Sequence, residues 1–326
     1  MAPNPLYDIS KLPATSQAAI REFDDRYIAS IGAAQPPSWA DFGDLIPVGA
    51  PMVTFPVSSF ALRYQQTMGE SRFKTLAEKS FDVKTQEFDA GYEGKLVDIL
   101  SQSFAYRNWT QGPARLLIAE ARHRNRSIVT LLEAGESTVW PIDGRNFFSA
   151  THLSDFNDAA STTWSNYQVT PKDVVSIPNI EAEVTIMQGA LDENGEKIGA
   201  DPDTIFVPTA KYEPLKNLLA KELILEATGA AAENNPYKGR FNVVHVPELT
   251  DANDWYLVDS KLRASSGLPP WLSLRWMVPT NSALALRYYD ESSDFFKDTG
   301  RIKASSHIWY GFSLGFPHSC RKVVGA

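Results

Sequence analysis

Three side chains between Asp143 and His152 are of the types that nucleophilic catalysis uses. Asp143, Ser149 and His152 could form a hydrolytic site, in which the histidine takes the serine proton and the aspartate orients the ring. They lie in a loop with an Asp-Gly turn, after a helix-like stretch that ends at Ala134-Gly135. The sharp Gly-x-Ser-x-Gly turn that exposes many serine nucleophiles is missing. A hydrolase is therefore the less favoured alternative, and we expect His152 to hold its own loop.

Other catalytic and cofactor signatures are absent from the sequence. It contains no phosphate-binding Gly-x-x-x-x-Gly-Lys-Ser/Thr loop, no Gly-x-Gly-x-x-Gly after a strand and no His-Glu-x-x-His. The five histidines lack the spacing of metal ligands: His123, His152, His245, His307 and His318. We expect no cofactor, no metal and no enzymatic activity.

Arginines are spaced to share one face of a predicted helix. Arg115, Arg122 and Arg126 are seven and four residues apart, and like charges at such spacing slightly destabilise a helix. One interpretation is a solvated or salt-bridged face. The functional alternative is a stripe that faces a polyanion, such as packaged DNA, or an acidic neighbouring subunit.

Composition limits the protein classes. The 326 residues are 43% hydrophobic and 11% aromatic, which is enough for a sizeable core, and a net charge of −8 argues against a surface that grips nucleic acid throughout. The single cysteine, Cys320, excludes an intrachain disulfide. No signal-peptide pattern and no apolar run of membrane-spanning length is present, so we expect no membrane association.

The N-terminal part has two segments without an obvious core of their own. Residues 1–50 are rich in proline, and one short stretch carries Ile20, Phe23, Tyr27 and Ile31 on a predicted helical face. This part is either a frayed terminus or an arm that orders against a neighbouring subunit. Residues 52–90 predict a long β-hairpin with few large apolar residues, which we expect to lie on another chain.

Periodicity predicts helices and strands in the remainder. Two helical stretches lie within residues 91–135: the first carries Leu96, Leu100 and Phe104, and the second begins near Gly112-Pro113 and ends before Gly135. A strand is predicted at Glu181–Met187. An α/β module follows, and its predicted elements are strand Thr204–Pro208, a helix that begins near Pro214 with Leu215, Leu218, Leu219 and Leu223 on one face, and strands Phe241–Val246 and Trp255–Asp259. The region from Trp271 to Phe316 is aromatic and β-like.

Three segments, in this order, resemble the major head protein of Mu-type tailed bacteriophages. The first is Asp143-Gly-Arg-Asn-Phe-Phe with His152 after it. The second is Ile198–Leu223, in which a short strand between prolines leads into a helix that ends Leu-Leu-Ala-Lys-Glu-Leu. The third is Asn235–Val246 followed by Asp254-Trp-Tyr-Leu-Val-Asp259.

The resemblance implies an α+β fold, the major capsid fold of tailed phages, herpesviruses and encapsulins. It would comprise an N-terminal arm, an extended loop, a spine helix, a peripheral domain and an axial domain. The corresponding ranges are 1–50 for the arm, 51–90 for the loop, 91–135 for the spine (with a possible break near residue 112), 136–200 with 291–326 for the peripheral domain, and 201–290 for the axial domain.

The implied function is that of a major capsid protein. Its copies would form hexamers and pentamers, interlock through the arm and the loop, and build an icosahedral head around double-stranded DNA. Implied partners are further copies, the packaged DNA, a portal and possible scaffolding or decoration proteins. The expected location is the virion, after assembly in the host cytoplasm. An encapsulin-like protein compartment with the same fold is the alternative.

Overall fold

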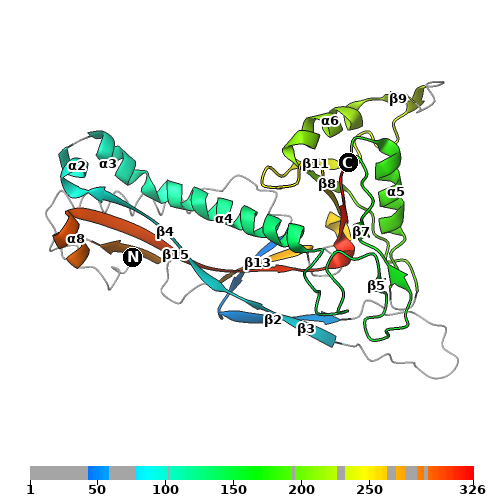
Figure 1. The fold of residues 1–326 in the computed structure, drawn as a ribbon, viewed down its shortest axis with the longest axis horizontal. Helices are drawn as coiled ribbons and strands as arrows, with labels where there is room; N and C mark the ends of the chain where they lie inside the picture. Colours follow the sequence, from blue (N-terminus) through cyan, green and yellow to red (C-terminus); the bar gives the residue numbers. More distant parts are fainter. Residues whose placement is uncertain are drawn as a thin grey trace.

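The computed structural model describes residues 43–58, 78–101, 103–192, 195–225, 232–262, 269–276, 285–289 and 293–326. Figure 1 shows an elongated limb, built on a long strand and a long helix, joined to a more compact part that contains the C-terminus. The predicted arm helix, with Ile20 and Ile31, lies outside the described residues.

A five-stranded sheet runs along the limb. Its strands are β1 (Asp44–Val48), β4 (Gln86–Lys95), β13 (Trp271–Trp276), β14 (Ala285–Tyr289) and β15 (Arg301–Leu314). The long strand β15 pairs antiparallel with β4 on one side, and with β13 and β14 on the other. Strand β1 belongs to the range predicted as an arm but pairs parallel with β13, so these five residues are part of the sheet.

Helices α2 (Leu96–Ser101), α3 (Ser103–Thr110) and α4 (Gly112–Ala134) lie along this sheet, in the range predicted as the spine. The amide of Gln111 donates to Arg107 O and that of Arg115 to Gln111 O, so helical hydrogen bonding continues from α3 into α4. Helix α4 has 23 residues and is about 35 Å long at 1.5 Å per residue. Its buried side includes Leu116, Leu117, Ile128 and Leu132. The helix predicted from Gly112 to the residues before Gly135 is found as α4, and a single turn residue, Gln111, separates it from α3.

The predicted hairpin consists of β2 (Met52–Ser58) and β3 (Glu78–Lys84), which pair antiparallel. The expectation that it lacks a local core is wrong for its described part. Val57, Phe81 and Val83 are buried in the main core. Lys79 Nζ also donates to Ile142 O and Phe156 O, each at 2.7 Å. The described part of the hairpin is therefore fixed on its own subunit.

The compact part is a second sheet with helices beside it. Its strands, in spatial order, are β11 (Asn242–His245), β8 (Thr204–Val207), β12 (Trp255–Val258), β16 (Cys320–Val323) and β7 (Tyr167–Gln168). Helices α5 (Ile177–Gln188) and α6 (Thr209–Ala220) belong to this part (Figure 1). The remaining elements are β5 (His152–Leu153), β6 (Thr163–Trp164), β9 (Leu223–Leu225), β10 (Ala232–Asn234), α8 (Asp294–Thr299) and the 3-10 turn η3 (Pro317–Ser319).

Two local predictions are wrong. Glu181–Met187 belongs to helix α5, not to a strand, because Ile180, Val184 and Met187 recur at helical spacing and are buried together. Helix α6 begins at Thr209, so Pro214 lies inside it. Leu215, the next residue, is fully buried.

The sheets cut across the boundaries predicted at residues 200 and 290. Strands β7 and β16 lie in the sheet of β8 and β12, and β13 and β14 pair with β15. Division of the chain at residues 200 and 290 would therefore separate hydrogen-bonded strands. The sequence did not indicate these pairings, because local periodicity does not show which strands pair. One hydrophobic core joins the two sheets, in which Phe206 and Trp271 meet edge to face at 5.6 Å.

Candidate functional site

The loop between Trp140 and His152 is shaped by its own short-range hydrogen bonds. Gly144 has φ of +74°, which a glycine adopts without strain. The carboxylate of Asp143 accepts from the amide of Arg145 at 2.9 Å, and the amide of Trp140 donates to Arg145 O at 2.6 Å. This turn directs Phe147 into the core, where its side chain is fully buried.

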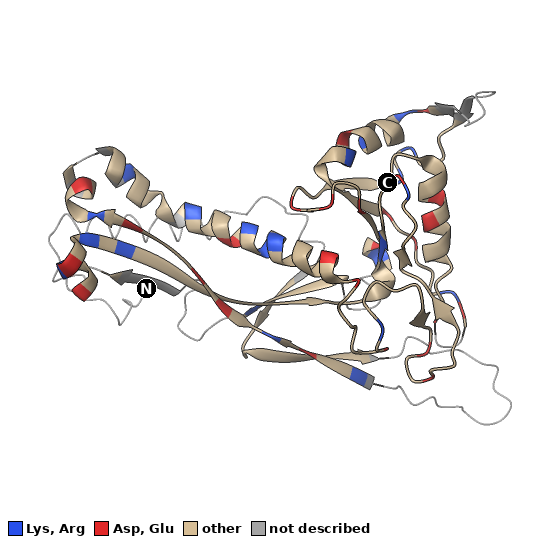
Figure 2. Cartoon of the chain, in the orientation of Figure 1, with Lys and Arg blue, Asp and Glu red and all other residues tan. Residues whose placement is uncertain are grey.

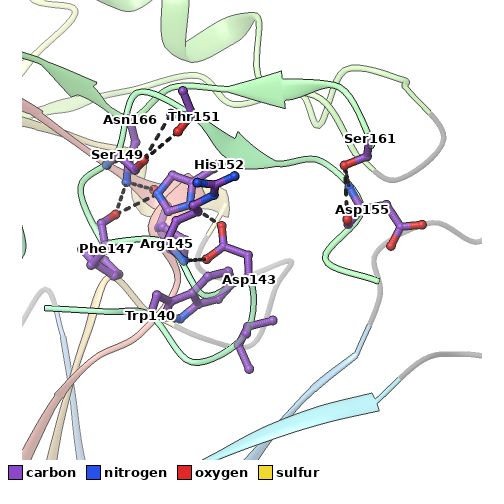
Figure 3. A network of polar contacts seen from close by, with 12 residues as sticks. Trp140, Asp143, Arg145, Phe147, Ser149, Thr151, His152, Asp155, Ser161 and Asn166 are labelled. Carbon is purple, nitrogen blue, oxygen red and sulfur yellow. Dashed lines mark hydrogen bonds and ion pairs between the residues drawn. The ribbon is translucent and has the colours of Figure 1, made fainter. Parts of the chain in front are cut away.

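His152 is held at both ring nitrogens (Figure 3). Nδ1 lies 2.6 Å from Asp143 Oδ2 and Nε2 lies 3.0 Å from Phe147 O, and the side chains of His152 and Asp143 are 0% and 1% exposed. A carbonyl oxygen only accepts, so Nε2 is the donor to Phe147 O, and Nδ1 faces the carboxylate of Asp143. The pair is a buried structural tie between the two ends of the loop.

This geometry does not support a Ser149–His152 hydrolytic mechanism. Ser149 Oγ contacts Thr151, at 3.2 Å from its amide, while both nitrogens of His152 have other partners. No ring nitrogen is available to take the serine proton, which that mechanism requires. The favoured prediction, that His152 holds its loop, agrees with these contacts.

Asn166, which no sequence pattern indicated, connects three distant segments. Its Oδ1 accepts from the amide of Ser149 at 2.9 Å, and its Nδ2 donates to Phe147 O at 2.8 Å and Pro317 O at 3.2 Å. Asn166 is 2% exposed, so these bonds are shielded from water. It fixes the loop against the turn that precedes β16.

Four rings form a column behind this loop. His152 stacks on Trp164 with centroids 4.7 Å apart, Trp164 stacks on His318 at 3.8 Å, and His318 stacks on Phe316 at 4.5 Å. Burial lowers the pKa of His318 well below its ordinary value, and His152 lowers it further. His318 therefore stays neutral at a pH where an exposed histidine would be charged.

We expect the subunit to lose stability as pH falls below about 6.5, the ordinary histidine pKa. There the unfolded chain binds a proton at His318 and the folded chain does not, so the free energy of unfolding falls by up to about 1.4 kcal/mol per pH unit. Chemical denaturation of dissociated subunits between pH 7.5 and 5 measures this slope. In His318→Phe the slope should decrease. An unchanged slope in His318→Phe would contradict the assignment.

Basic residues recur along α4 (Figure 2), the helix that contains the predicted arginine stripe. Arg115, Arg122 and Arg126 are all exposed. Arg115 donates to Asn108 Oδ1 at 3.2 Å, whereas no ion pair of Arg122 or Arg126 is found among the described residues. The structure thus places the three arginines together and excludes a salt-bridged face within the described part of the subunit.

Three buried charged side chains of the compact part, Glu183, Arg321 and Lys322, form ion pairs. Glu183, 0% exposed, accepts from Lys172 Nζ at 2.5 Å and from Arg321 Nε at 2.6 Å. Lys322 Nζ binds Glu136 and, at 3.0 Å, Asp254. These contacts fix β16 to α5 and to the end of the spine. Within the described ranges no cluster of His, Cys, Asp and Glu could hold a metal, and no helix there is long and apolar enough to cross a membrane.

Comparison with known proteins decides the family. The family model described as phage capsid protein matches residues 96–303, more than half of the chain. The chain belongs to the phage capsid protein family. No curated protein sequence matches it significantly.

Solved structures agree in fold. The subunit in the procapsid of bacteriophage JBD30 is 15% identical with a TM-score of 0.55, over 97% of this chain and 76% of that one. A chain of Microbacterium phage Oxtober96 is 10% identical, with a TM-score of 0.51, over 90% and 94%. A chain of the capsid of Ralstonia phage GP4 is 14% identical, with a TM-score of 0.51, over 87% of this chain and 86% of that one. The predicted α+β tailed-phage capsid fold is confirmed, and so is the role of a capsid protein that builds the phage head.

Proposed function

We propose that this capsid protein is the major subunit of a Mu-type icosahedral head that encloses double-stranded DNA, and that it assembles as hexamers and pentamers. The observation that carries the proposal is the capsid fold in a chain whose family is that of phage capsid proteins. The Mu-type relationship is supported by the three ordered sequence motifs. The loop motif is part of the packed core of the subunit, as a family feature should be.

The parts of the subunit follow from the sheets rather than from the predicted boundaries. We assign the peripheral domain to the spine with the sheet of β1, β4, β13, β14 and β15, and the axial domain to the sheet of β8 and β12 with α5 and α6. The hairpin β2–β3 is the extended loop, and the residues before β1 are the arm. The axial domains would surround the capsomer axis, while arm and loop would reach adjacent subunits.

Further partners are proposed on the same basis. They are the packaged DNA, a portal, and scaffolding or decoration proteins, with assembly in the host cytoplasm. An encapsulin-like compartment is the competing function for this fold, and the contents of isolated particles separate the two. Nucleic acid inside supports a phage head, and protein cargo supports a compartment.

The arginine stripe is proposed to meet an anionic partner in the shell, either DNA or an acidic part of a subunit. The double variant Arg122→Glu/Arg126→Glu should lower the yield of DNA-filled heads about tenfold, because repulsion replaces attraction along α4 in every subunit. DNA content of particles purified on a gradient measures this yield. The control is Lys216→Glu/Lys221→Glu, which makes the same charge change at exposed positions of the compact part.

The variant Arg122→Glu/Arg126→Glu also distinguishes between the two candidate partners of the stripe, DNA and an acidic part of a subunit. A loss of filled heads with normal empty shells indicates DNA, and a loss of shells altogether indicates a subunit contact. Normal yields of both particles would disprove the proposed role of the stripe.

A further inference from the structure

The spine is interrupted at a glycine followed by a proline. Helix α3 ends at Thr110 and α4 begins at Gly112, with the turn residue Gln111 between them. Pro113 has no N–H, so it cannot donate the helical hydrogen bond to the carbonyl of Trp109, four residues earlier. A helical run bends most readily where one hydrogen bond of its ladder is missing. The junction of α3 and α4 is therefore the weakest point of the spine.

A tyrosine from the strand beneath the spine binds at this junction. Tyr92 of β4 donates its hydroxyl proton to Trp109 O at 3.4 Å, the same oxygen that Pro113 cannot serve. The rings of Tyr92 and Trp109 also meet edge to face, with centroids 4.9 Å apart. Burial raises the pKa of Tyr92, and Arg115 acts against this shift. The hydroxyl therefore keeps its proton at neutral pH and remains a donor.

Gly112 provides the space for this ring. A Cβ at residue 112 would lie 2.0 Å from both Cζ and the hydroxyl oxygen of Tyr92, so any other residue would displace the tyrosine. A second contact crosses the same junction at the surface, where Arg115 of α4 donates to Asn108 Oδ1 of α3 at 3.2 Å. Side-chain contacts on both sides of the junction thus hold α3 and α4 at one angle.

The two sides of the junction pack in separate hydrophobic clusters. Trp109 of α3 belongs to a small cluster with Ile99 and Ala304, towards the end of the limb where α2 and α3 lie (Figure 1). Helix α4 contributes Ile128 and Leu132 to the main core instead. Strands β4 and β15 pair along both parts and keep the end of the limb attached. A change of angle at the junction would therefore tilt α3 without opening the main core.

We propose that residues 111–113 form a hinge in the spine and that the hydroxyl of Tyr92 is the lock that sets its angle. A few residues that lack part of the helical hydrogen bonding can absorb such a change of backbone angle. Six copies around one axis and five around another meet their neighbours at different angles, and the hinge lets the end of the limb follow both arrangements. This consequence rests on the proposed assembly, whereas the hinge and its lock do not.

A double-mutant cycle tests the lock. Tyr92→Phe removes only the hydroxyl and should raise the unfolding equilibrium constant of dissociated subunits about fivefold, as measured in urea. Pro113→Ala supplies the missing amide to Trp109 O, so in that background Tyr92→Phe should change the constant less than about twofold. The control is Tyr167→Phe, which removes a hydroxyl bonded to Glu136 beyond the other end of α4 and should act equally in both backgrounds. Equal effects of Tyr92→Phe in the two backgrounds would overturn the lock.

Distances between two spin labels measure the hinge itself. Cys320, the only native cysteine, is buried, so labels can be attached at Phe104→Cys of α3 and Thr130→Cys of α4, which are exposed positions. We expect one narrow distribution of distances in the dissociated subunit, about a twofold wider one in Tyr92→Phe, and a narrow one again when Pro113→Ala is added. A distribution that Tyr92→Phe leaves unchanged would overturn the hinge and leave the capsid function intact.

The variant Pro113→Ala also tests the consequence for assembly. Because its spine can form one continuous helix, refolded Pro113→Ala subunits should give several-fold fewer closed shells than the native chain in electron micrographs. Normal closed shells from this variant would contradict the role of the hinge in fitting hexamers and pentamers. Failure of the native chain itself to form shells would contradict the proposed function instead, so the two failures are distinguishable.

Discussion

Replacing Asp143 with alanine should destabilise the subunit by about 3–5 kcal/mol, the usual result of removing one partner from a buried ionic pair. His152 Nδ1 would lose its 2.6 Å contact and find no water, because the ring is fully buried. The amide of Arg145 would lose its acceptor as well. Urea unfolding of dissociated subunits measures the loss in free energy of unfolding.

Two further variants test whether the contact between Asp143 and His152 is the cause of this loss of stability. In Asp143→Asn the new amide can donate to Nδ1 of a neutral ring, so about half or more of the loss should be recovered without the charge. Ser149→Ala should change the free energy of unfolding by less than about 0.5 kcal/mol, because its hydroxyl lies at an exposed position. A stability of Asp143→Ala within about 1 kcal/mol of the native chain would show that the pair does not hold the loop.

Replacing Glu183 with glutamine should have an effect of similar size, about 3–5 kcal/mol. The side chains of Glu183 and Arg321 are 0% and 1% exposed, and Lys172 binds the same carboxylate. Burial already lowers the pKa of Arg321, and Glu183 acts against this shift. Without the negative charge, the guanidinium would remain buried beside a neutral amide while the amide nitrogen faces Lys172. Unfolding in guanidinium chloride, followed by tryptophan fluorescence, measures the loss in free energy of unfolding.

The control for Glu183 is the surface pair of Glu222 and Lys238. These side chains are 80% and 49% exposed, so Glu222→Gln should change the free energy of unfolding by less than about 1 kcal/mol. Equal effects of the two substitutions would mean that burial of the Glu183 pair has no energetic consequence.

Elements with local signals were predicted well from the sequence. Helix α4 begins at Gly112 and is followed by Gly135, as its glycines and apolar spacing indicate. Strands β8 and β12 are short apolar runs between polar or proline residues, and they lie within one residue of their predicted ends. For these elements, the residues that decide the structure are neighbours in the chain.

Features that depend on distant residues were not predictable in the same way. The strand predicted at Glu181–Met187 is part of helix α5, and only the distant Arg321 and Lys172 explain why the carboxylate of Glu183 is buried there. Strand β16 joins the compact sheet through β12 and β7, contacts that no local pattern encodes. The candidate site shows the same limit. The sequence analysis proposed roles for Asp143 and His152, whereas no local pattern indicated the roles of Asn166 and His318.

Electron microscopy of the purified, refolded protein under assembly conditions shows whether this chain builds a phage head. We expect closed icosahedral shells of hexamers and pentamers, in which the domain formed by the sheet of β8, β12 and β16 surrounds each capsomer axis. A protein that remains a dispersed monomer in all assembly conditions, with its fold intact by circular dichroism, would contradict it.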